Sequence, residues 1–243
     1  MELGELSQAI GRTWRELWPH LKKLEERKDV GRAMSAEEQG RLLDASATLR
    51  SPVVRTAIPL LMLTGLRSGE ALSLRWRQVN LFERTITVGR AKTSSGTGRL
   101  IPINDDLASL LASHRGWFVE RFGEPQPDHC VFPFGSPQPT VPDRPVTDIS
   151  SGWDPVRSLA GVHCRLHDLR HTFCTRLAEA GVPESTMLAL MGHMSRALLE
   201  RYSHIRMAAK RVAAAAITLR PLIENPEIVP MKVPVATTRG RIQ

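Results

Sequence analysis

Three short segments of the chain place arginine, histidine and tyrosine side chains at spacings that could do chemistry. In the first, residues 64–70, Arg67 follows closely on Gly65 at the expected start of a helix. Unpaired backbone N–H groups at such a position favour an anion. Glu70 lies three residues later on the same face, where it can orient the guanidinium. Taken alone, the pair also fits a solvated surface salt bridge.

The second segment combines a guanidinium with imidazole rings. His167 and Arg170 are three residues apart and share a helix face, and His171 follows directly. A planar, permanently charged fork beside an imidazole suits a phosphate better than a protein core. The apolar residues of this helix, spaced by three and four, predict a separate buried stripe: Leu166, Leu169, Phe173 and Leu177.

A metal site is the competing interpretation of this segment. Residues 167–171 imitate the HExxH zinc helix, with Asp168 in the place of the glutamate, and Cys164 and Cys174 are near in sequence. However, aspartate is shorter than the glutamate that acts as base, and Arg170 on the metal face would repel a divalent cation. We therefore predict no metal at this segment.

The third segment ends on the only tyrosine of the chain. Gly192 and His193 form an expected turn, Ser195 is a predicted helix N-cap, and Tyr202 falls two turns later. A tyrosine on a helix is commonly a half-buried core residue. Its position nine residues after His193 instead favours a chemical role.

The elements that must position these residues are mostly helical. Ser35 followed by Glu38 predicts a capping box and a helix through about Ala47. Further helices are expected at 52–63, from near 67, and at 105–122, 150–160, 168–180, 183–190, 195–202 and 207–219. Strands are expected at 85–88 and 99–103 around a turn at 91–98, and a proline-rich loop at 125–145. The predicted fold class is mainly α with a small antiparallel β-sheet (α+β).

The composition and net charge of the chain narrow the classes of partner that it could bind. The chain has 243 residues, with 33 Lys and Arg against 25 Asp and Glu, and a net charge of +8. No stretch approaches the roughly 18 apolar residues of a membrane span, and the acidic N-terminus is unlike a signal peptide. Three cysteines without a CxxC pair indicate free thiols and a cytoplasmic protein. The charge favours nucleic acid as partner, although a basic soluble enzyme would show the same balance.

Together, the segments resemble the catalytic domain of the tyrosine recombinases, the phage integrase family. The resemblance covers about residues 34–212, with the matching motifs in the family's order. These are the Arg box 64–70, the lysine-bearing hairpin 91–102 with Lys92, the His-x-x-Arg box 167–171, the Gly192-His193 turn, and Tyr202.

The resemblance implies a reaction on DNA that needs neither a metal nor another cofactor. Tyr202 would attack a phosphodiester and leave a 3′-phosphotyrosyl link and a free 5′-hydroxyl. A tyrosine hydroxyl, with a pKa near 10, is a poor nucleophile unless the developing charge is stabilised. Arg67 and Arg170 would clamp the non-bridging oxygens.

The remaining site residues are also assigned by resemblance. Lys92 would donate a proton to the leaving 5′-oxygen, and His167 and His193 would transfer protons or hydrogen-bond the phosphate. Glu70 and His171 are expected to support these groups rather than to touch the DNA. The implied activity is site-specific recombination or integration of DNA.

Three parts of the chain are expected: a leader or remnant helix at 1–33, the catalytic domain at 34–212, and a basic tail at 213–243. The leader is either the last helix of an upstream domain or an amphipathic helix packed on the body. Family members place a helical DNA-clamping domain first, and 33 residues are too few for one. We therefore expect a truncated gene, a fragment, or a partner that supplies the clamp. The alternative function is a DNA-binding remnant without recombination activity.

The expected partner is double-stranded DNA, bound by a homo-oligomer that forms a tetramer on it. Residues 201–243 hold eight Lys and Arg against two Glu. This tail either docks on a neighbouring protomer or contacts the DNA backbone.

Overall fold

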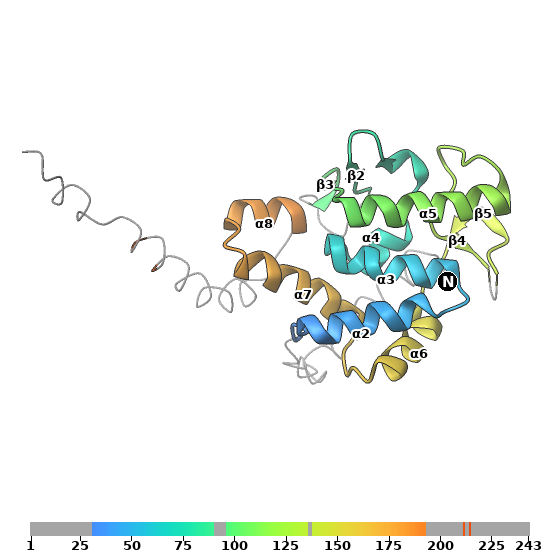
Figure 1. Ribbon diagram of the computed structural model, residues 1–243. Helices are drawn as coiled ribbons and strands as arrows, with labels where there is room; N and C mark the ends of the chain where they lie inside the picture. The colour runs from blue at the N-terminus through green and yellow to red at the C-terminus, as the bar shows by residue number, and fades with distance from the viewer. Residues whose placement is uncertain (1–30, 90–95, 136–137, 193–210, 212–213, 215–243) are drawn as a thin grey trace, which may run out of the picture. The chain divides into compact units, whose positions relative to one another are not determined.

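The computed structural model describes residues 31–89, 96–135 and 138–192, together with residues 211 and 214 (Figure 1). The chain divides into two compact units, Met1–Gly31 and Arg32–Gln243. The fold described below belongs to the second unit. The predicted helices at 195–202 and 207–219 lie outside the described residues, apart from the isolated positions 211 and 214.

Helices make up most of the described structure. Their bounds are α2 Ala36–Ala47, α3 Pro52–Thr64, α4 Ser68–Leu72, the 3₁₀ turn Trp76–Gln78, α5 Asp105–Phe122, α6 Ser150–Ala160, α7 Leu166–Glu179 and α8 Glu184–Met191. The predicted capping box of α2 is confirmed, since the Ser35 side chain accepts from the Glu38 N–H and the Glu38 carboxylate accepts from the Ser35 N–H. Asn104 caps α5 in a similar way through the N–H of Leu107.

Two small antiparallel sheets interrupt the helices. The first has the order β1 (Val79–Asn80), β2 (Thr85–Thr87) and β3 (Leu100–Pro102). Ile86 pairs with Ile101, and both side chains are buried. The second sheet pairs β4 (Pro133–Phe134) with β5 (Val141–Pro145). The two strands predicted around the hairpin are confirmed. The prediction of an irregular loop over 125–145 is wrong where β4 and β5 lie, because proline is tolerated in such short edge strands.

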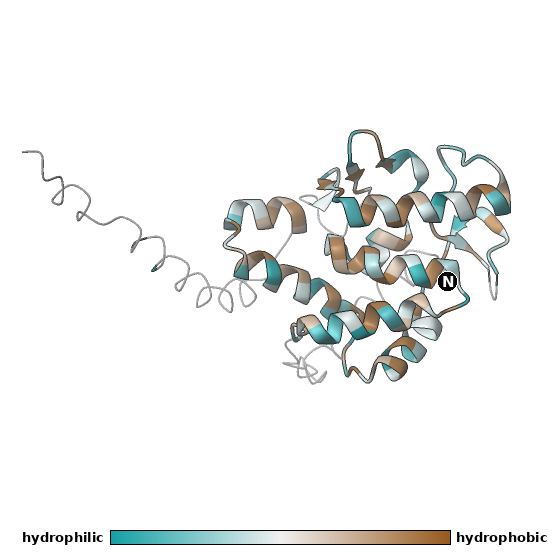
Figure 2. Cartoon of the chain, in the orientation of Figure 1, coloured by the Kyte–Doolittle hydropathy of each residue, from teal (hydrophilic) through white to brown (hydrophobic). Residues whose placement is uncertain are grey.

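The hydrophobic core is centred on α3. This helix packs against α2, α5 and α7, while α6 packs on the other side of α2 (Figure 1). Nine of the thirteen residues of α3 are buried, as expected for a helix surrounded on most sides. Figure 2 shows α5 alternating between apolar and polar positions, so that one face of α5 covers the core. The helices around α3 therefore form a rigid scaffold for the turn that follows it.

Within the described residues, no helix has the length and apolar character needed to cross a membrane.

Candidate active site

The site begins at the turn between α3 and α4. Gly65 ends α3 with a φ of 62°, a left-handed conformation that favours glycine. A Cβ atom at this position would overlap the ring of Phe173 on α7. The turn places Arg67 as the N-cap residue of α4. The end of α3 and the middle of α7 therefore meet at a glycine, directly beside the first predicted arginine.

Glu70 is a buried carboxylate that holds two arginines. One of its oxygens accepts from the Arg67 backbone N–H (3.0 Å) and from Nη2 of Arg99 (2.6 Å). The other accepts from Nη1 of Arg67 (3.0 Å) and from Nη1 of Arg99 at 3.4 Å. The Glu70 side chain is only 5% exposed. The solvated surface salt bridge that the sequence left open is therefore wrong for this pair.

Arg170 is buried as well. Its Nη1 donates to the Gly65 carbonyl (2.6 Å) and its Nη2 to the Met191 carbonyl (2.8 Å). The guanidinium thereby joins the end of α3 to the last turn of α8. Burial and the neighbouring positive charge of Arg67 lower the pKa of Arg170 to about 10, which still leaves it protonated at neutral pH.

The predicted division of α7 into an apolar stripe and a polar face needs correction. Leu169 is fully buried, but Leu166, Phe173 and Leu177 are only partly so. Arg170 lies among the buried positions instead of on a solvent face. The reason is that backbone carbonyls satisfy its guanidinium, so that burying the charge is tolerated.

The described part of the site carries excess positive charge. Arg67, Arg99 and Arg170 face one carboxylate, that of Glu70, which gives these four groups a net charge of +2. The side chain of Arg67 is 23% exposed, whereas those of Arg99 and Glu70 are each 5% exposed. Such an arrangement attracts an anion to the exposed side of Arg67.

His167 and His171 lie one turn apart on α7, with ring centroids 5.0 Å apart and the rings edge to face. Although His167 as a residue is exposed, the surrounding protein displaces water from part of its ring. This effect, followed by the charges of His171 and Arg170, lowers the pKa of His167 to about 4. The imidazole of His167 is therefore neutral at pH 7.

The end of α8 contacts the hairpin turn at Gly96. Gly192 has a φ of 74°, and a Cβ atom there would lie 2.8 Å from the Cα of Gly96. The Gly96 carbonyl accepts from Nη1 of Arg99 (2.6 Å). The segments that precede His193 and follow Lys92 in the sequence are thus packed together.

Five of the eight predicted site residues lie in the described part of the chain: Arg67, Glu70, His167, Arg170 and His171. The structure brings the first, second and fourth of these into one charged cluster. Lys92, His193 and Tyr202 lie outside the described residues.

Sequence reasoning missed Arg99. The alternation of side chains along the strand could have predicted its burial. Arg99, Ile101 and Ile103 share one face of the strand, and all three are buried. A charged side chain next to a hairpin turn is normally solvated, so nothing in the residue's position along the chain placed Arg99 in the site.

The described residues contain no group of three or more His, Cys, Asp or Glu arranged to hold a metal ion. Asp168, which lies between the two histidines of the HxxxH pattern, forms an ion pair with Arg165 at 3.0 Å. Burial raises the pKa of the Cys164 thiol to about 11, which disfavours the thiolate that a metal needs.

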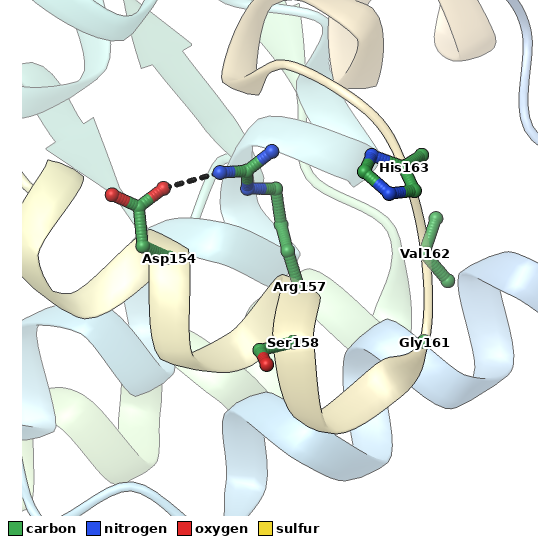
Figure 3. Close-up of a pocket in the computed structure, with 6 residues that line it drawn as sticks. All are labelled: Asp154, Arg157, Ser158, Gly161, Val162 and His163. Atoms are coloured by element: carbon green, nitrogen blue, oxygen red, sulfur yellow. Dashed lines mark hydrogen bonds and ion pairs between the residues drawn. The ribbon is translucent and has the colours of Figure 1, made fainter.

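A separate hollow of about 350 Å³ lies beside α6 (Figure 3). In it, Arg157 pairs with Asp154 at 2.5 Å and donates to the Cys164 carbonyl at 3.1 Å. Its charged groups are already paired with each other, so the hollow lacks the excess charge of the arginine cluster.

Comparison with known proteins places these features in a family. Residues 32–209 match the model of the phage integrase family. The chain is 27% identical over 208 residues to an integrase of Salmonella phage P22, covering 82% of this chain and 51% of that protein. It is 30% identical over 176 residues to tyrosine recombinase XerC of Xanthomonas campestris pv. campestris, covering 71% of this chain and 51% of that protein. The chain thus spans about half the length of these relatives.

Solved structures share the fold. The Tn1549 transposon integrase in complex with transposon right end DNA aligns with a TM-score of 0.60 at 21% identity, over 80% of this chain and 68% of that one. The catalytic domain of the bacteriophage HP1 integrase aligns with a TM-score of 0.54 at 20% identity, over 80% of this chain and 98% of that one. The chain therefore belongs to the phage integrase family, and its fold is that of a tyrosine recombinase catalytic domain.

Proposed function

We propose that this chain cuts and rejoins DNA strands in site-specific recombination, through a covalent 3′-phosphotyrosyl link to Tyr202. The observation that carries the proposal is the buried arginine cluster. Arg67 and Arg170 belong to one group of charges with a net positive excess, and each guanidinium is already fixed by protein partners. Fixed charges of this kind stabilise a phosphorane-like transition state without reorganising during the reaction.

The two arginines have different parts in this proposal. A guanidinium has five N–H donors, and the Glu70 carboxylate accepts one of those of Arg67. The partly exposed Arg67 side chain meets the incoming phosphate first. Arg170 supplies a buried charge behind it, held by carbonyl groups at the ends of α3 and α8.

The other roles follow from the family resemblance. The hydroxyl oxygen of Tyr202 attacks phosphorus and its proton leaves to solvent, while the bond from phosphorus to the 5′-oxygen breaks. Lys92 gives that oxygen a proton and then regains one from solvent. His193 hydrogen-bonds the phosphate. His167 is neutral at pH 7, which suits it to hydrogen-bonding rather than to holding a proton. The phosphotyrosyl link is itself a phosphodiester and retains the energy of the bond that was broken. A 5′-hydroxyl can therefore displace the tyrosine without a cofactor or metal.

Double-stranded DNA is the proposed partner, bound by a tetramer of the chain. The structural relatives support DNA as partner, since the Tn1549 integrase is bound to transposon right end DNA and XerH to difH substrate. Because the chain spans about half of its relatives, we propose that residues 34–212 form the catalytic domain and that a separate domain or partner supplies further grip on the DNA. The flanking parts, 1–33 and 213–243, are proposed to be a leader and a basic tail.

A DNA-binding remnant is the second candidate. It is favoured by one relative, 27% identical over 199 residues, which is named a putative defective protein IntQ of Escherichia coli K12. Such a remnant would bind DNA through the same arginine cluster without cutting it.

A trapping experiment separates the candidates. The protein is incubated in EDTA with a pool of nicked duplexes of randomised sequence, which lose a short strand after cleavage, and is then denatured. We expect a covalent protein–DNA adduct in the wild type and none in Tyr202→Phe. Binding without an adduct in the wild type would support the remnant instead. An activity that EDTA abolishes would contradict the metal-independent mechanism.

A further inference from the structure

Arg99 links three separate segments of the candidate site. Its Nη2 binds the Glu70 carboxylate at the start of α4, its Nε donates to the Leu190 carbonyl at the end of α8 (2.9 Å), and its Nη1 donates to the Gly96 carbonyl. The side chain is 5% exposed. A buried guanidinium with this many partners is a fixed part of the structure, unlike a solvated arginine on a hairpin.

The end of α8 is held by two arginines in succession. Arg99 binds the carbonyl of Leu190, and Arg170 binds the carbonyl of Met191. Cations at a helix C-terminus are favoured by the helix dipole, and here both also satisfy carbonyls that the helix leaves unpaired. The position of α8 relative to Arg170 is therefore fixed partly by Arg99.

Arg99 also determines how Glu70 holds Arg67. The same Glu70 oxygen accepts from Arg99 Nη2 and from the Arg67 backbone N–H. Without the fork of Arg99, both oxygens of the Glu70 carboxylate lose a donor. The carboxylate is then less fixed in orientation, and so is the Arg67 guanidinium that it binds.

We propose that Arg99 is a positioning residue for strand cleavage, which fixes Glu70, and through it Arg67, while tying the end of α8 to the same cluster. The inference rests on the function proposed above. Arg99 acts through Glu70 and α8 and does not itself contact the DNA.

The test uses the full chain with two substitutions. Arg99→Lys keeps the charge and loses the fork, and Arg99→Gln loses both. At saturating nicked duplex, we expect each to slow adduct formation about 10- to 100-fold, as small displacements of catalytic groups do, with the Kd for DNA within about threefold. The control is Arg157→Lys, which changes a more exposed ion pair with Asp154 beside α6 (Figure 3) and a contact with the Cys164 carbonyl. It should cleave like the wild type.

A second measurement does not depend on activity. The Arg67 amide, which donates to Glu70, should exchange its hydrogen faster in Arg99→Lys than in the wild type or in Arg157→Lys, as measured by NMR without DNA. This comparison remains valid if Arg99→Gln does not fold, because the lysine variant keeps the buried charge balanced.

The outcomes separate the two proposals. Arg99→Lys that cleaves at the wild-type rate, or that leaves exchange of the Arg67 amide unchanged, overturns the positioning role. A wild type that forms no adduct overturns the proposed function. In that case, the exchange rate of the Arg67 amide alone decides whether Arg99 fixes Arg67 through Glu70.

Discussion

Replacing Glu70 with glutamine removes the carboxylate that lies between the guanidinium groups of Arg67 and Arg99. Both partners remain in place, and the Arg99 side chain is as buried as Glu70 itself, at 5% exposure. Glutamine keeps the shape and one acceptor oxygen, but it leaves the cluster with three positive charges. The variant therefore isolates the charge of Glu70 from its packing.

The size of the effect follows from burial. Breaking a buried ion pair by removing one partner costs about 3–5 kcal/mol, and the retained acceptor places glutamine near the lower end, at about 3 kcal/mol. For a protein of this size, about 1 kcal/mol corresponds to roughly 2–4 °C in Tm. We therefore expect Glu70→Gln to lower the Tm by about 6–12 °C at pH 7, measured by calorimetry.

A matched control comes from the surface of α2. Glu37 pairs with Arg41 at 2.7 Å, but the two side chains are 82% and 42% exposed. Because exposed pairs contribute less than about 1 kcal/mol, Glu37→Gln should melt within a few degrees of the wild type. A Glu70→Gln protein that melts with this control would refute the assignment of Glu70 as a buried counter-charge.

The pH dependence gives a second check on Glu70. Burial raises its pKa, but the hydrogen bonds from Arg99 and from the Arg67 backbone outweigh burial, so the pKa lies below the ordinary value of 4.5. The stabilisation is therefore complete above pH 4.5 and is lost as the pH falls through the lowered pKa. The Tm difference between wild type and Glu70→Gln should shrink on acidification, and a difference that grows would contradict the sign.

Two further predictions concern glycines that support the site, and a third concerns His114, a buried residue of α5. Gly65→Ala should lower the free energy of unfolding by about 2 kcal/mol or more, through backbone strain and overlap with Phe173, and an urea titration that gives the wild-type midpoint would contradict this. Gly192→Ala should lose stability similarly, since its Cβ would lie 2.8 Å from Gly96 Cα; Gly116→Ala, whose Cβ meets nothing within 4 Å, is the control for both. Burial lowers the pKa of His114 to about 4, so the unfolded chain takes up a proton first, and His114 should cost up to about 3 kcal/mol of stability between pH 6.5 and 4. The His114→Gln variant should lose less stability in that window, and an equal loss would exclude His114 as the cause.

The sequence predicted most helices because their ends carry local signals. Ser35, with Glu38, and Asn104 cap helices whose observed bounds match the predicted ones. The β4–β5 pair was missed because its prolines suppress the strand pattern, although an edge pair can accommodate them. Short-range patterns thus predicted the scaffold well.

The charged cluster was less predictable. The arginines of both boxes were found from their spacing, but the burial of Arg170 was not, because a guanidinium is ordinarily solvated. Its burial depends on the carbonyls of Gly65 and Met191, which lie 105 and 21 residues away in sequence. Arg99 was missed for the same reason, since its carboxylate partner lies 29 residues away.

We propose that Arg67 binds the scissile phosphate, with the buried charge of Arg170 behind it, while Tyr202 attacks the phosphorus. The most direct test is the single-turnover rate of adduct formation at saturating nicked duplex in Arg67→Ala and in Arg170→Ala. Loss of either fixed positive charge near the transition state should slow the reaction by about 10²–10³-fold or more, with the Kd for DNA changed only a few-fold. Adduct formation at close to the wild-type rate in either variant would contradict the claim.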